Sequence, residues 1–381
     1  LGCDLDLKMM QDHLNEWYET TSRGMLGPEP GDAKEVQILN RTLKWGVDGI
    51  TYEGDDKHAK TVIAAMGLAA NSKGLDQALV KDDTGEDESE ALVGTAAKRY
   101  RSIAAVVNYM SLDRPDLQFA ASVLGRSMSR PTVAAEARLK KVARYLVSHP
   151  RVVYHYGTAQ LDAAVEMVAW TDSDWAGCRV SRRSTSGGLL SVAGGVIKSW
   201  SNRQGSVALS SAEAEFYAAG KAAVEALGAR SLCADLGWGC TLQIRMDAEA
   251  ARAIASRQGI GKVRHLEVRY LWLQDKVRRG EIKLVKVWGK ENPADVLTEP
   301  MSFSDALGLL GSFHLKAALL CGWSDVRSDA GWIRGGVLEF KYTLLPTIIY
   351  KLACCTSIWP YLPGANCVNI PWPFGSSDSQ N

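Results

Sequence analysis

Hydrophobic and polar residues recur with two different periods along the chain, and the change of period separates its parts. Between 98 and 148, apolar residues return every three or four positions, which predicts helices that pack on one another. From about 160 onward, short apolar runs are separated by glycine and serine, as consecutive antiparallel strands would be. We therefore expect a helical part followed by a part built on a sheet.

The elements predicted after residue 160 come in a definite order. They are strands at 163–172, 186–194 and 195–202, a helix at 210–229, a strand at 242–247, a helix from Ala248, a basic helical stretch at 263–280, a strand at 281–289 and a capped helix start at 292–300. This order predicts an α/β fold in which a mixed five-stranded sheet is flanked by helices and preceded by a smaller, mostly helical region.

The remaining segments are less regular. Residues 1–80 read as mixed helix and strand, with a short helix at 55–68, and no clear pattern continues beyond Pro300. The acidic run at 81–90 is typical of a solvated linker. The predicted division is therefore a first region at 1–80, an acidic linker at 81–97, a helical connection at 98–158, the sheet domain at 160–300 and an unassigned tail at 301–381.

Composition is that of an ordinary globular chain. The 381 residues are 46% hydrophobic and 23% charged, with a net charge of +1, so any basic surface must be local. Eight cysteines without a CxxC pair or a Cys/His cluster predict reduced thiols, and no secretory signal opens the chain. We expect an intracellular protein, in the cytoplasm or nucleus. The apolar stretch 342–362 contains Lys351 and two prolines, which count against a membrane span.

Two acids end the first predicted strand of the sheet domain. Val168, Trp170 and Asp172 share one face of that strand because side chains alternate with a period of two. Asp174 is expected beyond the strand, in the turn. Asp172 is therefore the acid whose side-chain direction the strand should determine.

The helix that follows also carries two acids. Ser210 and Glu213 have the spacing of a capping box, which gives Glu213 a structural role. Glu215 lies at the edge of the small-residue face that packs on the sheet. No Lys or Arg stands four residues from it on this helix, so its carboxylate needs another partner.

Two further acids complete a set. Asp247 ends a predicted strand, and Asp295 lies in the first turn of a helix with Asn292 as its cap. Each alone has a structural explanation, as a cap or as a charge that complements the helix dipole. Together with Asp172 and Glu215 they supply the hard oxygen ligands of a two-metal phosphodiesterase site. Bound cations would offset the repulsion between these carboxylates.

Six segments in order resemble the ribonuclease H domain of Ty/copia-type retrotransposon Pol polyproteins. They are "TDSDWAG", "RRSTSGG", "IKSWSNRQGSVALSSAEAEFYA", "MDAEAARAIA", "RHLEVRYLWLQD" and "NPADVLTEP". Residues 100–150 resemble the connection that precedes this domain in the same family. Residues 35–68 resemble the late, thumb-side part of the reverse transcriptase, so 1–80 is interpreted as a truncated remnant of it. The chain begins with Leu1 and is expected to be part of a longer protein.

The resemblance implies a function. The family's metal ligands correspond to Asp172, Glu215, Asp247 and Asp295, and its activity is endonucleolytic cleavage of the RNA strand of RNA–DNA hybrids. It implies two Mg²⁺ ions, with Mn²⁺ as a substitute, the remainder of the Pol polyprotein as a partner, and a virus-like particle if the element is active. No Tyr-x-Asp-Asp motif is present, so polymerase activity is not expected. Glu299 and Leu271 stand where the family usually has Lys and His.

Several residues are candidates for holding the hybrid. Basic groups would track phosphates, and hydroxyls would contact 2′-hydroxyl groups. The candidates are Arg179, Arg182, Arg183, Ser186, Ser210, Ser211, Lys262, Arg264, His265 and Arg269. Lys276, Arg278 and Arg279 add charge to the later helices, where a solvated helix face explains them equally well.

Two other interpretations stay open. A degenerate element remnant would keep the fold and at most bind nucleic acid, and the missing polymerase core favours it. An integrase or transposase of the same general fold would use three acids to join DNA strands. The four acids and the "SSAEAEFYA" helix after three strands argue against that second alternative.

Overall fold

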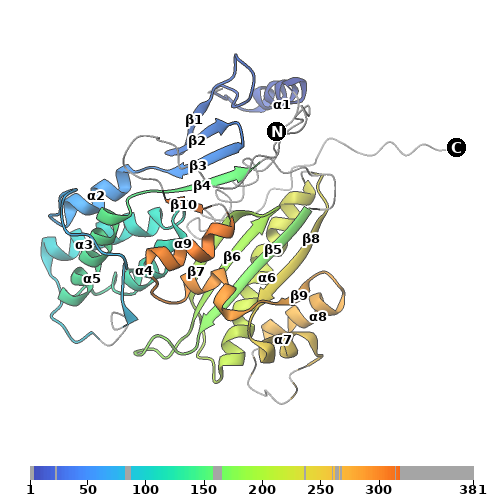
Figure 1. The fold of residues 1–381 in the computed structure, drawn as a ribbon. Coiled ribbons are helices and arrows are strands. Elements are labelled where there is room, and N and C mark those ends of the chain that lie inside the picture. Colours follow the sequence, from blue (N-terminus) through green and yellow to red (C-terminus); the bar gives the residue numbers. More distant parts are fainter. Residues whose placement is uncertain are drawn as a thin grey trace, which may run out of the picture.

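The strands form two five-stranded sheets that lie beside one another (Figure 1). The computed structural model describes residues 4–21, 24–81, 87–157, 165–235, 237–259, 261, 266, 268–313 and 315–317. Residues 82–86 of the acidic run and the apolar stretch 342–362 lie outside the described residues.

The first sheet is antiparallel, in the order β1-β2-β3-β4-β10. Its strands are β1 (Glu35–Ile38), β2 (Arg41–Gly46), β3 (Gly49–Gly54), β4 (Val152–Gly157) and β10 (Leu315–Ala317). The helices of this half are α1 (Asp4–Trp17), α2 (Lys57–Ala65), α3 (Gly94–Met110), α4 (Pro115–Arg126) and α5 (Val133–Ser148). The part before residue 158 therefore contains a sheet as well as the expected helices.

The predicted connection at 98–158 ends in a strand rather than a helix. In β4, Val152, Tyr154 and Tyr156 are buried while the residues between them are half-buried. This period of two belongs to a strand with one face on the core. The strand was missed because it is short and follows a long helical pattern directly.

The second sheet is mixed, in the order β7-β6-β5-β8-β9. Its strands are β5 (Val165–Asp174), β6 (Thr185–Val192), β7 (Gly195–Arg203), β8 (Cys240–Met246) and β9 (Lys283–Lys286). The strand β6 is antiparallel to both β5 and β7, whereas β8 runs parallel to both β5 and β9. The predicted fold class, a ribonuclease H-like mixed sheet flanked by helices, is confirmed.

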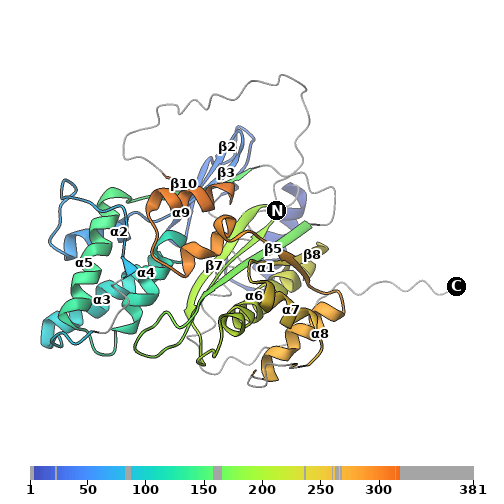
Figure 2. The ribbon, with the colours of Figure 1, turned by 60° about the horizontal axis from the view of Figure 1, so that its bottom comes forward.

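Helices cover both faces of this mixed sheet (Figure 2). The helix α6 packs on β5, β6 and β8, while the short helix η4 packs on β5 and β6 from the other side. The α-helices of this half are α6 (Ser211–Asp235), α7 (Glu249–Ser256), α8 (Trp272–Arg278) and α9 (Phe303–Leu310). The 3₁₀ segments are η2 (Val268–Leu271), η3 (Gly289–Glu291), η4 (Pro293–Leu297) and η5 (Gly311–Phe313).

The helical block is packed directly against the mixed sheet. The helix α4 contacts β7 and η4, and Gln118 of α4 donates hydrogen bonds to the Ser199 carbonyl and hydroxyl at 3.1 and 2.9 Å. One hydrophobic cluster continues through both sheets. The sheet domain thus shares its core with the connection region.

The first residues beyond Pro300 also belong to this core. Phe303, Leu310 and Leu315 are buried, and β10 pairs with β4. The backbone N–H of Phe303 donates to the Asp76 carbonyl at 2.9 Å, so α9 is held by the segment that crosses the helical block. Sequence analysis found no pattern here because α9, η5 and β10 are too short to show a period.

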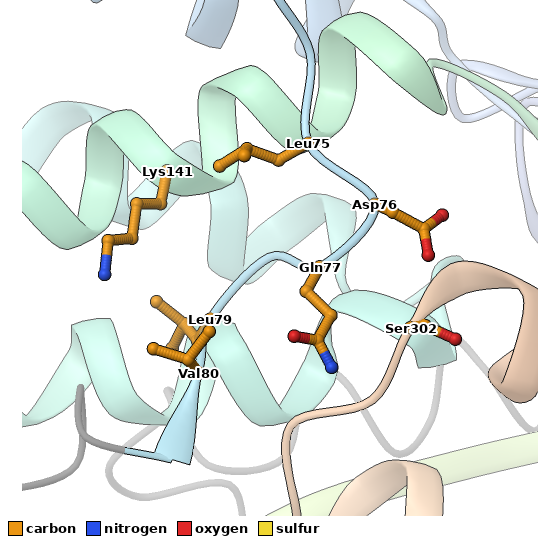
Figure 3. A pocket seen from close by; sticks show the side chains of 7 residues that line it. All are labelled: Leu75, Asp76, Gln77, Leu79, Val80, Lys141 and Ser302. Carbon is orange, nitrogen blue, oxygen red and sulfur yellow. The ribbon is translucent and has the colours of Figure 1, made fainter.

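That crossing segment lines an open pocket of about 490 Å³ between α5 and the start of α9 (Figure 3). Its lining residues are Leu75, Asp76, Gln77, Leu79, Val80, Lys141 and Ser302. None of the four predicted ligand carboxylates is among them. Over the part of the chain that the structure describes, no helix has the length and apolarity needed to cross a membrane.

Candidate metal centre

Asp172 lies near the end of β5, opposite Gly187 of β6. The hydroxyl of Thr298 donates a hydrogen bond to its Oδ2. Burial raises the pKa of Asp172, the charge of Asp247 raises it further, and the Thr298 hydrogen bond opposes both effects. The sheet thus presents a carboxylate whose charged form requires a positive partner.

Glu215 is 7% exposed and lies in the second turn of α6. Its Oε1 accepts hydrogen bonds from the backbone N–H and the hydroxyl of Ser173, at 3.0 and 3.2 Å. Its Oε2 is buried and has no hydrogen-bond partner among the described residues. Burial, and then the charge of Asp172, raise the pKa of Glu215 to about 9. A buried carboxylate oxygen without a donor fits a cation ligand.

Asp247 follows β8 directly. Because β8 is parallel to β5, the carboxyl ends of both strands lie at one edge of the sheet. The backbone of Gly289 passes so close that a Cβ there would lie 3.2 Å from Asp247 Oδ2. The loop after β9 therefore borders this carboxylate.

These three carboxylates meet at one point. One oxygen each from Asp172, Glu215 and Asp247 lies within 4.8 Å of the others, and the three side chains can hold a metal ion. Their sequence positions are far apart, and β5, α6 and β8 bring them together. The chemistry of the site, three carboxylates with one unpartnered buried oxygen, suits a hard divalent cation.

Asp295 stands beside this cluster rather than in it. It lies in η4, which Asn292 caps by accepting from the Ala294 N–H at 3.2 Å. The Asn292 amide also donates to the Thr171 carbonyl at 3.1 Å, which fastens η4 to β5 one residue before Asp172. Burial, and then the charges of Asp172 and Asp247, raise the pKa of Asp295 to about 8. Its role as a fourth ligand stays a prediction.

The two acids assigned other roles are also placed. Asp174 is the last residue of β5 and pairs with Thr185, so the expectation that it lies in the turn is wrong. The strand continues because Asp174 accepts a hydrogen bond from the Thr185 N–H. Glu213 has the structural role predicted for it, since its N–H donates to Ser210 Oγ at 3.2 Å and its carboxylate accepts from the Leu209 N–H at 2.8 Å.

The structure describes seven of the ten candidates for holding the hybrid. Ser186 is 4% exposed and accepts from Gln204 at 2.9 Å, whereas Ser211 is exposed at the first position of α6. Arg179, Arg182 and Arg183 lie between β5 and β6, and Arg269 is exposed over the Tyr270 ring. Lys262, Arg264 and His265 lie outside the described residues. Contacts of all these residues with nucleic acid stay predictions.

The later basic residues are paired with acids instead of facing solvent alone. Lys276 contacts Glu281 at 2.9 Å, and Arg278 and Arg279 both contact Asp275. These ion pairs partly neutralise the three positive charges. Asp275 precedes Arg278 and Arg279 by three and four residues, the spacing at which side chains meet on a helix, so these two pairs could have been predicted from the sequence.

Thr298 and Gly187 were missed as parts of the site. Both occur in quoted motifs, "NPADVLTEP" and "RRSTSGG", but neither residue type indicates a role alone. A Cβ at Gly187 would lie 2.6 Å from Thr298 Cγ2 and 2.9 Å from the Ala294 carbonyl oxygen. The glycine lets η4 approach the sheet closely enough for Thr298 to reach Asp172.

Comparison with known proteins identifies homologues of the chain. It is 28% identical over 211 residues to the retrovirus-related Pol polyprotein from transposon RE1 of Arabidopsis thaliana, which covers 55% of this chain. The corresponding polyprotein from transposon TNT 1-94 of Nicotiana tabacum is 28% identical over 200 residues, or 52% of this chain. The chain is homologous to Pol polyproteins of copia-type retrotransposons. The resemblance stated from its motifs is confirmed.

The chain spans only 14% of the RE1 polyprotein and 15% of the TNT 1-94 polyprotein. A shorter relative is the secreted RxLR effector protein 161 of Plasmopara viticola, 38% identical over 126 residues, which are 33% of this chain and 87% of that protein. No protein-family model matches the chain.

Proposed function

We propose that the chain is the ribonuclease H part of a copia-type Pol polyprotein and cleaves the RNA strand of RNA–DNA hybrids. The observation that carries this proposal is the meeting of Asp172, Glu215 and Asp247 at one edge of a ribonuclease H-like sheet. Asp295 would act as a fourth carboxylate beside them. The partner would be the remainder of the polyprotein, inside the cell.

Mg²⁺ is the proposed cofactor, with Mn²⁺ as a substitute. When bound, a pair of such ions supplies an activated water and stabilises the leaving oxygen of a phosphodiester. The residues of this chain hold and orient the ligands. Ser173 fixes one oxygen of Glu215 and leaves the other open, and Thr298 fixes one oxygen of Asp172.

Substitution of single ligands in the full chain tests this proposal. We expect wild-type protein to cleave a labelled hybrid with Mg²⁺ or Mn²⁺ and to leave single-stranded RNA intact. Asp172→Asn and Asp247→Asn should abolish cleavage without changing the circular dichroism spectrum. Asp235→Asn, at the exposed end of α6, is the matched control and should cleave normally. Full activity of both ligand variants would refute the assignment.

One observation favours the alternative of an inactive remnant. Glu299 adds negative charge that raises the pKa of both Asp172 and Asp295, at a position where the family usually carries Lys. A folded wild-type chain that binds the hybrid but never cleaves it with either ion would support this alternative. Strand transfer between DNA molecules would instead support an integrase.

A further inference from the structure

A basic segment with an exposed tryptophan follows the last strand of the mixed sheet. Lys283 and Lys286 lie in β9, Trp288 follows it, and Lys290 lies in η3. All three lysines are exposed, and Trp288 is 69% exposed. We call Lys286, Trp288 and Lys290 the β9 rim.

The lysines of the β9 rim have no acidic partner within the described residues, unlike several cations elsewhere in this half of the chain. Lys198 and Lys221 share Glu225, and Lys276 contacts Glu281. Lys286 instead places its amine 4.9 Å from the centre of the Trp288 ring. Charge that the protein does not neutralise is available for phosphate groups.

The β9 rim borders the metal centre. Gly289 lies next to Trp288 in the chain, and its Cβ position would be 3.2 Å from Asp247 Oδ2. The N–H of Val287 donates to the Met246 carbonyl at 3.2 Å, which fixes this loop to the end of β8. Trp288 is therefore next in the chain to the residue that borders Asp247, beside the position at which the proposed function places a phosphate of the bound strand.

The kind of nucleic acid follows from the chemistry of the rim. Bases inside a duplex stack on their neighbours and turn no face outward, so an exposed indole ring can stack only on an unpaired base or a duplex end. Stacking of a base on an aromatic ring contributes about 1–3 kcal/mol and tolerates any sequence. Lys286 and Lys290 lie two residues before and two residues after Trp288 in the chain, which suits the phosphates of the same strand.

We propose that the β9 rim binds an unpaired nucleotide of the strand that crosses the metal centre. Trp288 stacks on its base, and Lys286 and Lys290 contact the flanking phosphates. The site therefore favours hybrids in which single-stranded RNA adjoins the duplex over blunt hybrids. This inference rests on the proposed function for the position of the strand.

Equilibrium binding in EDTA, where no cleavage occurs, tests the stacking. The probes are a blunt hybrid and the same hybrid with a single-stranded RNA extension at either end. Trp288→Ala in the full chain should weaken binding of one extended hybrid by about tenfold, as loss of a stacked base predicts, and leave the blunt hybrid unaffected. Trp288→Phe should restore most of this affinity. Trp17→Ala, which removes another exposed tryptophan (72%) in α1, is the control and should change nothing.

The lysines are tested by salt dependence. For single-stranded nucleic acid, each phosphate contact contributes a slope of about 0.7 to the plot of log affinity against log salt. The double variant Lys286→Gln with Lys290→Gln should lower the slope for the extended hybrid by about 1.4, whereas Lys60→Gln on α2 should not. Equal affinity of wild type and Trp288→Ala for every extended hybrid would overturn the β9 rim even if cleavage is normal. Trp288-dependent binding without any cleavage by wild type would retain the rim and refute the nuclease.

Discussion

The Thr298 hydroxyl donates its hydrogen bond to Oδ2 of Asp172 across 126 residues of sequence. Asp172 lies two residues before the end of β5, the central strand of the mixed sheet, and Thr298 follows the short helix η4 that carries Asp295. This bond therefore joins two of the four acidic segments. It also fixes which Asp172 oxygen stays available to a cation.

Removal of this hydroxyl should weaken metal binding. Thr298→Val leaves Asp172 without its donor, so the pKa of Asp172 should rise further and its charged form should become less populated. A hydrogen bond to a charged group contributes about 1.5–3 kcal/mol, so Mn²⁺ affinity measured by calorimetry should fall about tenfold or more. Thr298→Ser keeps the hydroxyl and is the control. Unchanged Mn²⁺ affinity in the valine variant would show that the bond does not position the ligand.

The close approach of η4 to the sheet depends on Gly187. A Cβ at this position would lie 2.6 Å from Thr298 Cγ2 and 2.9 Å from Leu297 Cβ. Gly187→Ala should therefore push η4 outward, lower the free energy of unfolding by about 1–3 kcal/mol and reduce cleavage. Urea unfolding and a cleavage assay on the same preparation measure both effects.

A matched glycine substitution separates this steric effect from a general effect of alanine. Gly308 lies in α9, and nothing stands within 4 Å of its Cβ position. Gly308→Ala should be neutral or raise stability by about 0.5–1 kcal/mol, because alanine favours the helix. If both variants unfold at the same urea concentration, the crowding at Gly187 has no energetic consequence.

The sequence predicts most of the mixed sheet because its signals are local. The alternation in "VAWTD" directs Asp172, and the parallel course of β8 places Asp247 at the same edge. Glu215 was identified because its helix offers it no partner. Its hydrogen-bond donor proves to be Ser173, and two further carboxylates lie beside it. What could not be predicted depends on contacts between distant segments.

Three such contacts illustrate this limit. The pairing of Asp174 with Thr185 extends β5 beyond its expected end. The strand β10 pairs with β4 although 157 residues, which include the whole mixed sheet, lie between these two strands. Arg230 of α6 pairs with Glu281, which lies 51 residues later in the chain. None of these partners follows from a period or a motif.

The clustered carboxylates should make stability depend on pH. Burial and mutual repulsion raise the pKa of Glu215 to about 9 and that of Asp295 to about 8, far above their values in an unfolded chain. A carboxyl group whose pKa is higher in the folded state than in the unfolded state stabilises the fold while it is protonated. This contribution is fully present below the unfolded pKa, about 4, and is lost as the pH rises through about 8 and 9. The melting temperature in EDTA should therefore fall over this range.

Two comparisons isolate this effect from other titrating groups. Glu215→Gln cannot ionise, so its melting temperature in EDTA should fall less between about pH 4 and pH 9 than that of wild type. Mn²⁺ should raise the melting temperature of wild type most at the alkaline end, where the ligand oxygens are charged. An identical pH dependence of wild type and Glu215→Gln would contradict the assigned cause.

The residues just beyond Pro300 should be required for stability. The ring of Phe303 is 7% exposed and stacks on His149, with ring centres 3.9 Å apart and planes inclined by 23°. Removal of a buried phenylalanine side chain typically costs about 3–5 kcal/mol, so Phe303→Ala should lower the urea midpoint strongly. Ser304→Ala, at the next and exposed position, should stay within about 0.5 kcal/mol of wild type.

A chain that ends at Pro300 should be less stable than one that ends at Ala317, because only the longer chain keeps α9 and β10. Equal urea midpoints for the two truncated chains would show that the ribonuclease H-like part is complete at Pro300, as the predicted division at 160–300 assumes.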